Sequence, residues 1–328
     1  MGQAFSKFRE SLTFHTLVLS TGTSEDDAPP HRWSGDATKK DMALCFVIFN
    51  PARTRRLIMN YCYVVNEFKR RGFPTYTIEL VFSGRQPEIA DSLRVHGSSI
   101  LFHKEKLFRI LERRIPPSYH KIALLDADIL FDDASWYTKT SALLDTHDVV
   151  QPFENAHWLD IEYKRAVLSR PSVVKMQSAE YDSSFHPGFA WCFRRDYYRK
   201  VGFFDLAVSG SGDTLSAAAW LGKTIPKKSK SLPECVREAH AAFCKLKKPR
   251  IAFLKGCDVF HLFHGPRRKR MYQERHELLK AVKNIRDILT ENADGVYEWK
   301  DRSWNDMFYE YFIGRDDDGL EVGVRCKR

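Results

Sequence analysis

The chain has 328 residues, of which 43% are hydrophobic and 13% aromatic, and this composition indicates a globular protein with a sizeable core. Lysine and arginine outnumber aspartate and glutamate by 52 to 42, and the net charge of +10 favours an anionic partner such as a nucleotide, a nucleic acid or an acidic membrane face. Seven scattered cysteines without a C-x-x-C pair argue against a disulfide framework or a zinc site. No apolar run reaches the length of about 18 residues that spans a bilayer. We therefore expect a soluble, cytoplasmic protein.

The N-terminal segment differs from the rest of the chain. Polar clusters such as STGTSEDDAPP, without hydrophobic periodicity, predict a partly disordered extension over residues 1–41. Its first residues, MGQAFS, fit the pattern for N-myristoylation at Gly2, and Lys7 and Arg9 add positive charge nearby. Unless the match arises by chance, it predicts reversible, peripheral membrane association through the N-terminus.

From residue 44 onwards, strand patterns alternate with helix patterns. The apolar run 44–49 predicts a strand, Asn50 and Pro51 predict the cap and first residue of a helix that Gly72 ends, and residues 75–82 predict a second strand. A short helix over 104–114 precedes the central strand, KIALLDADILF. This alternation predicts an α/β fold with an open, mostly parallel, Rossmann-like sheet flanked by helices in one large domain, in which ligands bind at the carboxyl ends of the strands.

The second half of the chain is less regular. The expected elements are, in order, a short strand at 149–153, a strand entered by HPGFAW (186–191), a glycine loop at 209–213 before a helix over 214–221, a mobile basic loop at 223–250, a strand at 257–264, a long amphipathic helix at 271–289 and an aromatic tail at 299–312 that packs on the core.

Two carboxylates, Asp126 and Asp128, end the apolar part of the central strand and are separated by Ala127. Alternate residues of an extended chain point the same way and lie about 7 Å apart, so both carboxylates are expected to face one cleft. This arrangement suits Mn²⁺ or Mg²⁺, which accept one or two protein carboxylates together with phosphate oxygens. We expect Asp128 to bind the metal most directly and Asp126 to reach the ribose or a metal-bound water. An isolated D-x-D pair is also explained by solvation of a strand end.

Other polar side chains complete a site for a nucleotide diphosphate leaving group. His261 and His264 are expected either to complete the metal coordination or to pack in the core. Arg267, Arg268 and Arg270 follow them, and are expected either to grip phosphates through forked hydrogen bonds or to form a solvated run of charge.

Two carboxylates have roles that the sequence leaves open. Asp213, on the glycine loop, is the candidate general base that takes the proton of an acceptor hydroxyl, and it also suits the N-cap of the next helix. Glu79, in a largely buried strand, is either paired structurally or accepts hydrogen bonds from a ligand.

In their order and spacing these motifs resemble metal-dependent glycosyltransferases of the GT-A fold, and most closely the soluble ones of bacteria and large DNA viruses. The resemblance covers roughly Ala43 to Arg275 and rests on Asn50-Pro51, Lys104-Glu105, LLDADILF followed by Trp136, VQPF at 150–153, HPGFAW, GSGD at 210–213, and HLFHG at 261–265 followed by Arg270, Tyr272 and Arg275.

The resemblance implies that Asp126 and Asp128 bind the metal and nucleotide, that Asn50, Glu79 and Lys104 belong to the donor pocket, that Phe189 and Trp191 line the sugar and acceptor region, and that Asp213 is the base. The complete set of expected site residues adds those argued from the sequence itself. The expected site residues are Asp126, Asp128, His261 and His264 for the metal, Asn50, Arg53, Glu79, Lys104, Asp126, Arg267 and Arg270 for the nucleotide-sugar donor, Gln151, Phe189, Trp191 and Gly212 for the sugar and acceptor, and Asp213 as the base. Gly212 is a departure, because many relatives carry an acidic residue at that position. The expected organisation is an extension (1–41), a catalytic domain (42–265) with a nucleotide-sugar half (42–130) and an acceptor half (131–265), and a basic loop with C-terminal helices (266–328).

The main functional hypothesis is an inverting glycosyltransferase that uses Mn²⁺ or Mg²⁺, a nucleotide sugar with UDP as the expected nucleotide, and a glycan or glycoprotein acceptor. A sugar nucleotidyltransferase is an alternative, although Asn50–Arg53 is not the glycine-rich phosphate loop that usually follows the first strand of such enzymes. A basic nucleic-acid-binding protein, with patches at 227–230 and 267–270, is an alternative of another class. The main hypothesis expects no nucleic-acid partner.

Overall fold

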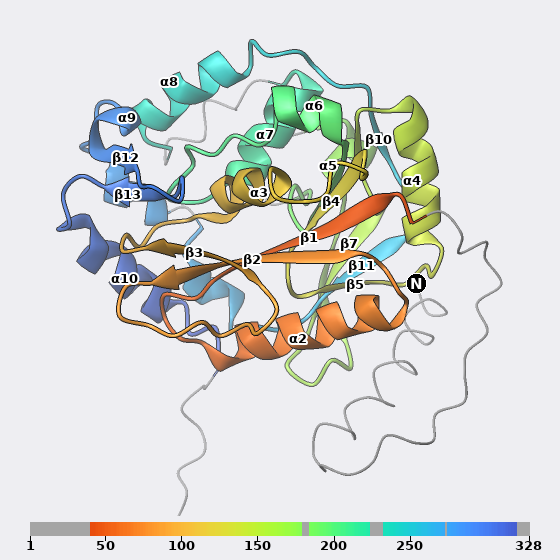
Figure 1. Ribbon diagram of the computed structural model, residues 1–328, viewed down its shortest axis with the longest axis horizontal. Coiled ribbons are helices and arrows are strands. Elements are labelled where there is room, and N and C mark those ends of the chain that lie inside the picture. Colours follow the sequence, from red (N-terminus) through yellow and green to blue (C-terminus); the bar gives the residue numbers. More distant parts are fainter. Residues whose placement is uncertain (1–39, 179–183, 224–231, 273, 320–328) are drawn as a thin grey trace, which may run out of the picture.

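The computed structural model describes residues 40–178, 184–223, 232–272 and 274–319 (Figure 1). The predicted lipidation site at Gly2 and the extension up to residue 39 lie outside these ranges, as does the basic patch at 227–230.

Seven strands form the central sheet. They are β1 (Met42–Phe49), β2 (Thr75–Phe82), β3 (Leu93–Gly97), β4 (Lys121–Leu125), β6 (Val149–Gln151), β9 (Ala190–Arg194) and β10 (Ile251–Phe253). Their spatial order is β10-β6-β9-β4-β1-β2-β3, and neighbours run parallel except for β9, which is antiparallel to both β4 and β6. The prediction of an α/β fold with a mostly parallel sheet is confirmed.

Helices cover both faces of this sheet. They are α2 (Arg55–Arg70), α3 (Lys104–Glu112), α4 (Trp136–Thr146), α5 (Val173–Met176), α6 (Arg195–Lys200), α7 (Gly212–Leu221), α8 (Glu234–Phe243), α9 (Ile285–Ile288) and α10 (Trp304–Gly314), with the 3-10 helices η1 (Arg267–Arg270) and η2 (Glu274–Leu279). In Figure 1, α2 lies below the sheet, and α3, α6 and α7 lie above it.

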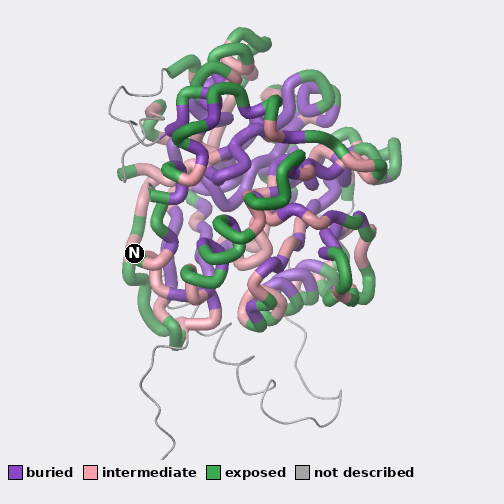
Figure 2. Tube along the Cα trace, turned by 90° about the vertical axis from the view of Figure 1, so that its left-hand side faces the viewer, coloured by how far each residue is buried: buried purple, intermediate pink, exposed green. Residues whose placement is uncertain are grey.

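The sequence of β1 shows why the sheet needs cover on both faces. Leu44, Phe46 and Ile48 belong to a buried cluster with α2 and α4, whereas Ala43 and Cys45 belong to a second cluster with α3 and α6. Figure 2 shows buried residues in the interior of the molecule and exposed residues mainly at its periphery. Successive side chains of a strand point to opposite faces, so a strand covered on both sides reads as a continuous apolar run.

A second sheet has four strands. Its strands are β5 (Ile129–Phe131), β7 (Asn155–Leu159), β8 (Ala166–Pro171) and β11 (Asp258–His261), in the order β5-β11-β7-β8. Because β4 and β5 belong to different sheets, the turn 126–128 connects the two. The backbone fixes this turn at both ends: the Asp126 amide donates to the carbonyl of Phe189 (2.8 Å), and the Leu262 amide donates to the carbonyl of Asp128 (2.7 Å).

The C-terminal part packs on the core, as the sequence predicts. The hairpin of β12 (Leu289–Glu291) and β13 (Tyr297–Trp299) and the helix α10 share a third buried cluster with Val208 and Leu215 of the glycine loop and α7. In the described ranges, no helix combines the length and the apolar character that a membrane crossing requires.

Two predicted segments in the second half are wrong. The amphipathic pattern at 271–289 forms η2, a turn and the short helix α9 instead of one long helix, because Asn284 begins a new helix by accepting a hydrogen bond from the Arg286 amide (3.1 Å). The predicted solvated loop at 223–250 contains α8, whose Cys235 and Val236 are buried in the third cluster.

The prediction for the first helix is right in type but wrong at its start. Asn50 is not the N-cap, because α2 begins only at Arg55. The Asn50 side chain instead accepts hydrogen bonds from the amide and hydroxyl of Thr54 and donates one to the Thr54 carbonyl, so it orders the turn between β1 and α2.

Candidate functional site

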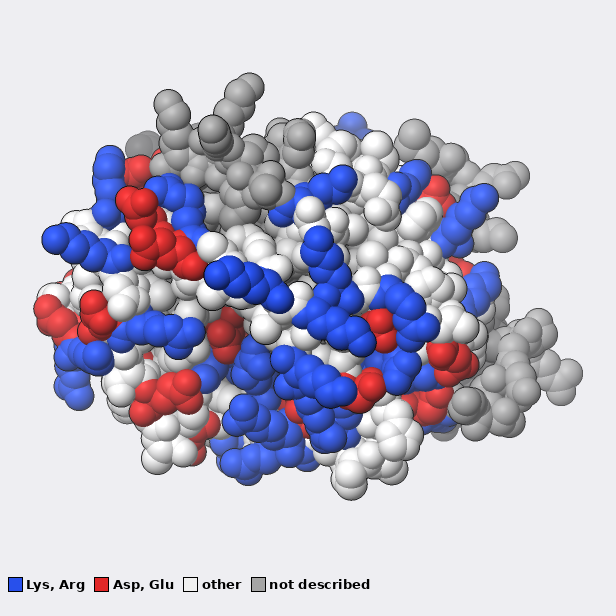
Figure 3. Space-filling view, turned by 90° about the horizontal axis from the view of Figure 1, so that it is seen from above, with Lys and Arg blue, Asp and Glu red and all other residues white. Residues whose placement is uncertain are grey.

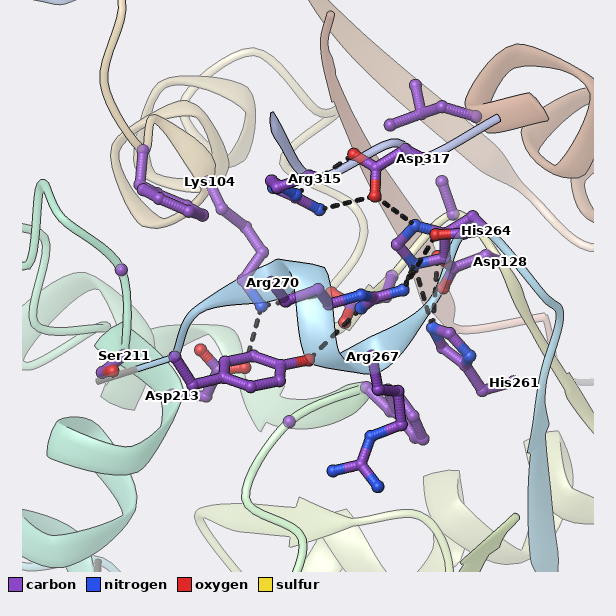
Figure 4. A pocket seen from close by; sticks show the side chains of 18 of the residues that line it. Lys104, Asp128, Ser211, Asp213, His261, His264, Arg267, Arg270, Arg315 and Asp317 are labelled. Carbon is purple, nitrogen blue, oxygen red and sulfur yellow. Dashed lines mark hydrogen bonds and ion pairs between the residues drawn. The ribbon is translucent and has the colours of Figure 1, made fainter. Parts of the chain in front are cut away.

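A cavity of about 400 Å³ opens at the carboxyl end of β1 and β4 (Figure 4). Its walls include the turn after β1, the turn 126–128, the starts of α3 and α7, the end of β11 with η1, and the C-terminal residues 311–317. Trp158 of β7, Arg170 of β8 and the loop 185–189 also line it. Open parallel sheets place ligand sites beyond the carboxyl ends of their strands, as this cavity is placed.

Three predicted metal ligands converge in the cavity. Asp128 Oδ2 lies 2.9 Å from His264 Nε2 and 3.5 Å from His261 Nε2, and the two Nε2 atoms lie 3.1 Å apart. The candidate ligand atoms all lie within 4.8 Å of one another. We call Asp128, His261 and His264 the Asp/His/His group.

The hydrogen bonds of this group leave unprotonated ligand atoms facing its centre, as a bound cation requires. His264 Nδ1 donates to Asp317 Oδ1 (3.2 Å), which leaves a lone pair on Nε2, the atom that faces Asp128. Burial lowers the pKa of His261 to about 4, so its ring is neutral, as metal binding requires. Within the described residues, the buried Asp128 Oδ1 has no hydrogen-bond partner. A carboxylate with two imidazoles is a donor set that Mn²⁺ accepts.

Arg270 lies against the same group. Its Nη2 donates to His264 Nε2 (2.7 Å), and Nη1 donates to the hydroxyl of Tyr272 (3.3 Å). Because His264 cannot use one lone pair for both Arg270 and a metal, Arg270 has to turn away when a metal binds.

The second cluster of the cavity is a pair of carboxylates bridged by Lys104. Its Nζ donates to Asp126 Oδ1 (3.2 Å) and to Asp213 Oδ2 (2.9 Å). Burial raises the pKa of Asp126 to about 6, although Lys104 opposes the shift. Burial also acts to raise the pKa of Asp213, but there Lys104 prevails and the pKa is lowered. Asp213 is therefore the carboxylate that stays ionised.

Asp126 does not join the Asp/His/His group. The two carboxylates lie on a turn after β4 ends at Leu125, and not on an extended strand, so they reach the cavity in different directions. Asp126 points to Lys104, while Asp128 points to the histidines. The expected geometry of alternate strand residues is wrong, although both side chains line one cavity as predicted.

Asp213 is held by a network that the sequence does not reveal. It is the second residue of α7, whereas the N-cap is Ser211, so Asp213 is not the cap. Ser211 is fixed by His276 Nε2 (3.1 Å) and by Arg275, whose Nη2 donates to its hydroxyl (2.9 Å). Gly188 leaves room for the carboxylate, because a Cβ there would lie 2.6 Å from Asp213 Oδ2.

Glu105 is a cavity carboxylate that belongs to the Lys104-Glu105 motif but to which the sequence analysis assigns no role. It occupies the space beside Gly212, where any side chain on residue 212 would collide with it. Burial raises the pKa of Glu105 to about 8, and Asp213, with which it shares a hydrogen bond, adds to the shift. Gly212 itself does not line the cavity; its role is to admit Glu105.

Several predicted site residues lie outside the cavity wall. The Glu79 carboxylate accepts hydrogen bonds from the amides of Glu88 and Ile89 and from the Ser92 hydroxyl, so it orders the loop after β2. Arg53 is exposed and does not line the cavity. The structure thus places Glu79 in a structural role.

Gln151 and Trp191 do not line the cavity but bind the backbone of a loop that does. Gln151 Nε2 donates to the carbonyl of His186 (3.1 Å), and Trp191 Nε1 donates to the carbonyl of Pro187 (2.8 Å). Both side chains hold the loop that carries Phe189, whose ring lies in the cavity wall and stacks on His261 with centroids 4.7 Å apart.

The arginine cluster at 267–270 is neither one phosphate grip nor one solvated run. Arg270 is buried at the Asp/His/His group, Lys269 pairs with Asp316 (2.7 Å), and Arg268 is exposed. Figure 4 shows the guanidinium of Arg267 pointing away from Arg270. On the face shown in Figure 3, basic side chains are numerous but interrupted by acidic ones.

The C-terminal segment contributes residues that the sequence analysis does not assign. Asp317 orients His264 and pairs with Arg315 (3.1 Å), and Tyr311, Phe312 and Arg315 line the cavity wall. The acidic run 316–318 is the only signal in the sequence, and such a run usually indicates a solvated turn.

No family model matches the chain, and no curated protein matches its sequence. Solved structures resemble it at low identity. For a variant of Drosophila β1,4-galactosyltransferase 7, solved with manganese, UDP-galactose and xylobiose, the identity is 10%, the match covers 80% of this chain and 98% of that one, and the TM-score is 0.38. For the glycosyltransferase GlyE of Streptococcus pneumoniae the identity is 11%, the match covers 83% of this chain and 60% of that one, and the TM-score is 0.29. For 4-diphosphocytidyl-2C-methyl-D-erythritol synthase of Anaerococcus prevotii the identity is 8%, the match covers 73% of this chain and 96% of that one, and the TM-score is 0.31.

The structural matches thus include glycosyltransferases of the predicted kind. At these TM-scores they carry no argument about what this chain does.

Proposed function

We propose that the chain is a metal-dependent, inverting glycosyltransferase that moves a sugar from a nucleotide sugar, with UDP as the expected nucleotide, to a glycan or glycoprotein hydroxyl. The proposal rests on the side chains that line one cavity. The Asp/His/His group and the carboxylate pair bridged by Lys104 both line it, so a metal site and a candidate base face the same space.

The Asp/His/His group supports the donor half of the reaction. A Mn²⁺ or Mg²⁺ ion bound there would neutralise the charge that develops on a departing diphosphate. Arg270 reaches the same place with a planar, forked guanidinium, which binds phosphate oxygens through two parallel hydrogen bonds. We assign Arg270 to the diphosphate once it leaves His264.

Asp213 supports the acceptor half as the general base. It is ionised because Lys104 lowers its pKa, and a base has to be ionised to accept the proton of the acceptor hydroxyl. Glu105 keeps a proton near neutral pH and donates its hydrogen bond to Asp213, which fixes the orientation of the base. A carboxylate that activates the acceptor from one side while the diphosphate leaves on the other predicts inversion at the anomeric carbon.

The test is a thermal-shift screen of nucleotide sugars with and without Mn²⁺. We expect at least one UDP-sugar to raise the melting temperature only when Mn²⁺ is present, and Asp128→Asn to abolish the shift. Asp91→Asn, at an exposed site, is the control. A protein that responds to duplex DNA and to no nucleotide sugar would refute the proposal in favour of a nucleic-acid-binding role.

A further inference from the structure

A second cationic cluster lines the cavity, and it consists of Arg170 and Arg267 with Trp158. The guanidinium carbon of Arg170 lies 5.7 Å from the centroid of the Trp158 ring, and that of Arg267 lies 5.2 Å from it. All three side chains line the cavity. Both arginines thus stack within cation–π distance of the same indole.

The two sheets and η1 bring these side chains together. Trp158 is on β7 and Arg170 on β8, where Ala156 pairs with Arg170 and Trp158 pairs with Leu168. Residues 158 and 170 are therefore diagonal neighbours on one face of the hairpin. Arg267 arrives from η1, which follows β11. Cross-strand packing on an aromatic ring holds each guanidinium in place before a ligand arrives.

Within this cluster, Arg267 lacks the carboxylate partner that other cations of the cavity have in the described residues. Lys104 pairs with two carboxylates and Arg315 with Asp317. In the part of the chain that the structure describes, no carboxylate pairs with Arg267, and its buried Nε has no hydrogen-bond partner. Burial lowers the pKa of Arg267, as expected for a cation without a counter-ion.

The Trp158 ring packs directly against the Asp/His/His group, because its centroid lies 6.2 Å from that of His261, and the Phe189 ring contacts both rings. The guanidinium of Arg267, however, points away from Arg270, which lies at His264 (Figure 4). An anion bound by Arg267 on this side is therefore distinct from a phosphate that Arg270 binds beside Asp128. It is a second negative group on a molecule that occupies the cavity.

We infer that Arg170, Trp158 and Arg267 form a subsite for an acidic substituent, a carboxylate, sulfate or phosphate, carried by one of the two sugars of the proposed transfer reaction. This inference rests on the proposed function and adds the charge class of its substrate. A guanidinium fork matches the flat, two-oxygen edge of such groups, and a neutral hydroxyl leaves one of these cations without a counter-ion. The acidic sugar is either the transferred sugar of the donor or a sugar of the acceptor.

The test compares acidic sugars with their neutral counterparts by calorimetry in the presence of Mn²⁺. The donor arm uses UDP-glucuronate against UDP-glucose. The acceptor arm uses methyl glucuronide and glucose 6-phosphate against methyl glucoside and glucose, each with UDP present. We expect an acidic probe in one arm to bind about 10-fold to 100-fold more tightly than its counterpart, the range for hydrogen bonds to charged groups, and the responding arm identifies which sugar is acidic.

The variants assign that preference to these residues. Arg267→Gln and Arg170→Gln should each remove it. Arg170→Gln, at a residue that is not assigned to the nucleotide, should also leave the binding of UDP with Mn²⁺ unchanged. Arg268→Gln, next to Arg267 but exposed and outside the cavity wall, should keep it. Arg267→Lys retains the charge but not the fork and should lose part of the preference, so it reports on the subsite even if a glutamine variant folds poorly.

Two results would overturn the inference. One is the absence of any acidic preference in a protein that binds UDP with Mn²⁺. The other is a preference that survives both glutamine variants. Failure of the unmodified protein to bind UDP with Mn²⁺ would refute the proposed function as well.

Discussion

Glu105 gives the clearest quantitative test of the cavity's electrostatics. Its carboxyl is buried between Gly212 and Asp213, and burial raises its pKa from 4.5 to about 8. In the unfolded chain the same group ionises near 4.5. The folded protein therefore binds more protons than the unfolded chain between these two pH values. The contribution of Glu105 to stability is complete below about pH 4.5 and is lost as the pH rises through 8.

The size of the effect follows from the shift. One pKa unit corresponds to about 1.4 kcal/mol. Between pH 6 and pH 8 the folded state holds a proton that the unfolded state has lost, so this interval costs wild-type protein about 2–3 kcal/mol of unfolding free energy, and little more is lost by pH 9. The glutamine of Glu105→Gln keeps a hydrogen-bond donor beside Asp213 but does not titrate. The stability of Glu105→Gln relative to wild type should therefore rise by about 2–3 kcal/mol between pH 6 and pH 9.

Urea unfolding at pH 6 and pH 9 measures this difference directly. Glu277→Gln, an exposed carboxylate paired with Lys280, is the matched control and should not change the pH dependence. Parallel pH profiles for wild type and Glu105→Gln would show that Glu105 is ionised throughout, and the account of a protonated partner for Asp213 would be wrong.

Three further outcomes test the assignment of roles. Asp213→Asn should lower the transfer rate by about 10²–10⁴-fold, the usual contribution of a general base, and leave calorimetric UDP binding intact; a lost UDP signal would instead mean a binding role. Asp317→Asn should weaken Mn²⁺ binding about 10-fold to 100-fold, because partners that orient a metal-binding histidine contribute that much; unchanged affinity in a Mn²⁺ titration would exclude His264 as a ligand. Gly188→Ala should displace the Asp213 carboxylate and lower the transfer rate while the melting temperature falls by only a few degrees, and an active variant would show that the carboxylate need not stay where it is.

Strands of the central sheet are predicted well from the sequence, because their burial on both faces is visible as a short hydrophobic segment. The bounds of β2, Thr75–Phe82, coincide with the predicted strand, because the segment is rich in β-branched and aromatic residues and its last six residues are buried. The central motif succeeds for the same reason. The apolar residues 122–125 belong to β4, and the chain leaves the sheet at the charged Asp126.

Helical spacing is less decisive in the C-terminal part. Leu279, Val282 and Ile285 recur at helical intervals, yet they belong to η2, a turn and α9. All three lie in the third buried cluster, so their spacing records which residues face the core and not a continuous helix. Only the cap at Asn284 distinguishes the two, and an asparagine in a polar stretch is a weak signal.

The site residues that the sequence analysis misses cannot be recognised from their residue type, because tertiary packing decides whether they reach the cavity. Glu105 enters the cavity because Gly212 has no side chain, a relation between α3 and α7 that no local pattern records. Conversely, Glu79 has the right type and lies near a strand end, but the amides of residues 88 and 89 use its carboxylate. Residue type alone identifies candidates, and the partners of each side chain decide among them.

The acidic run at 316–318 shows how the end of the described chain takes part in the site. Asp318 accepts a hydrogen bond from the Arg56 amide (2.8 Å), Asp316 pairs with Lys269, and Asp317 binds His264 and Arg315. Each aspartate thus has a different partner, so the segment is docked at three points and not solvated. Asp317 thus connects this segment to His264 of the Asp/His/His group, where it accepts the hydrogen bond of Nδ1.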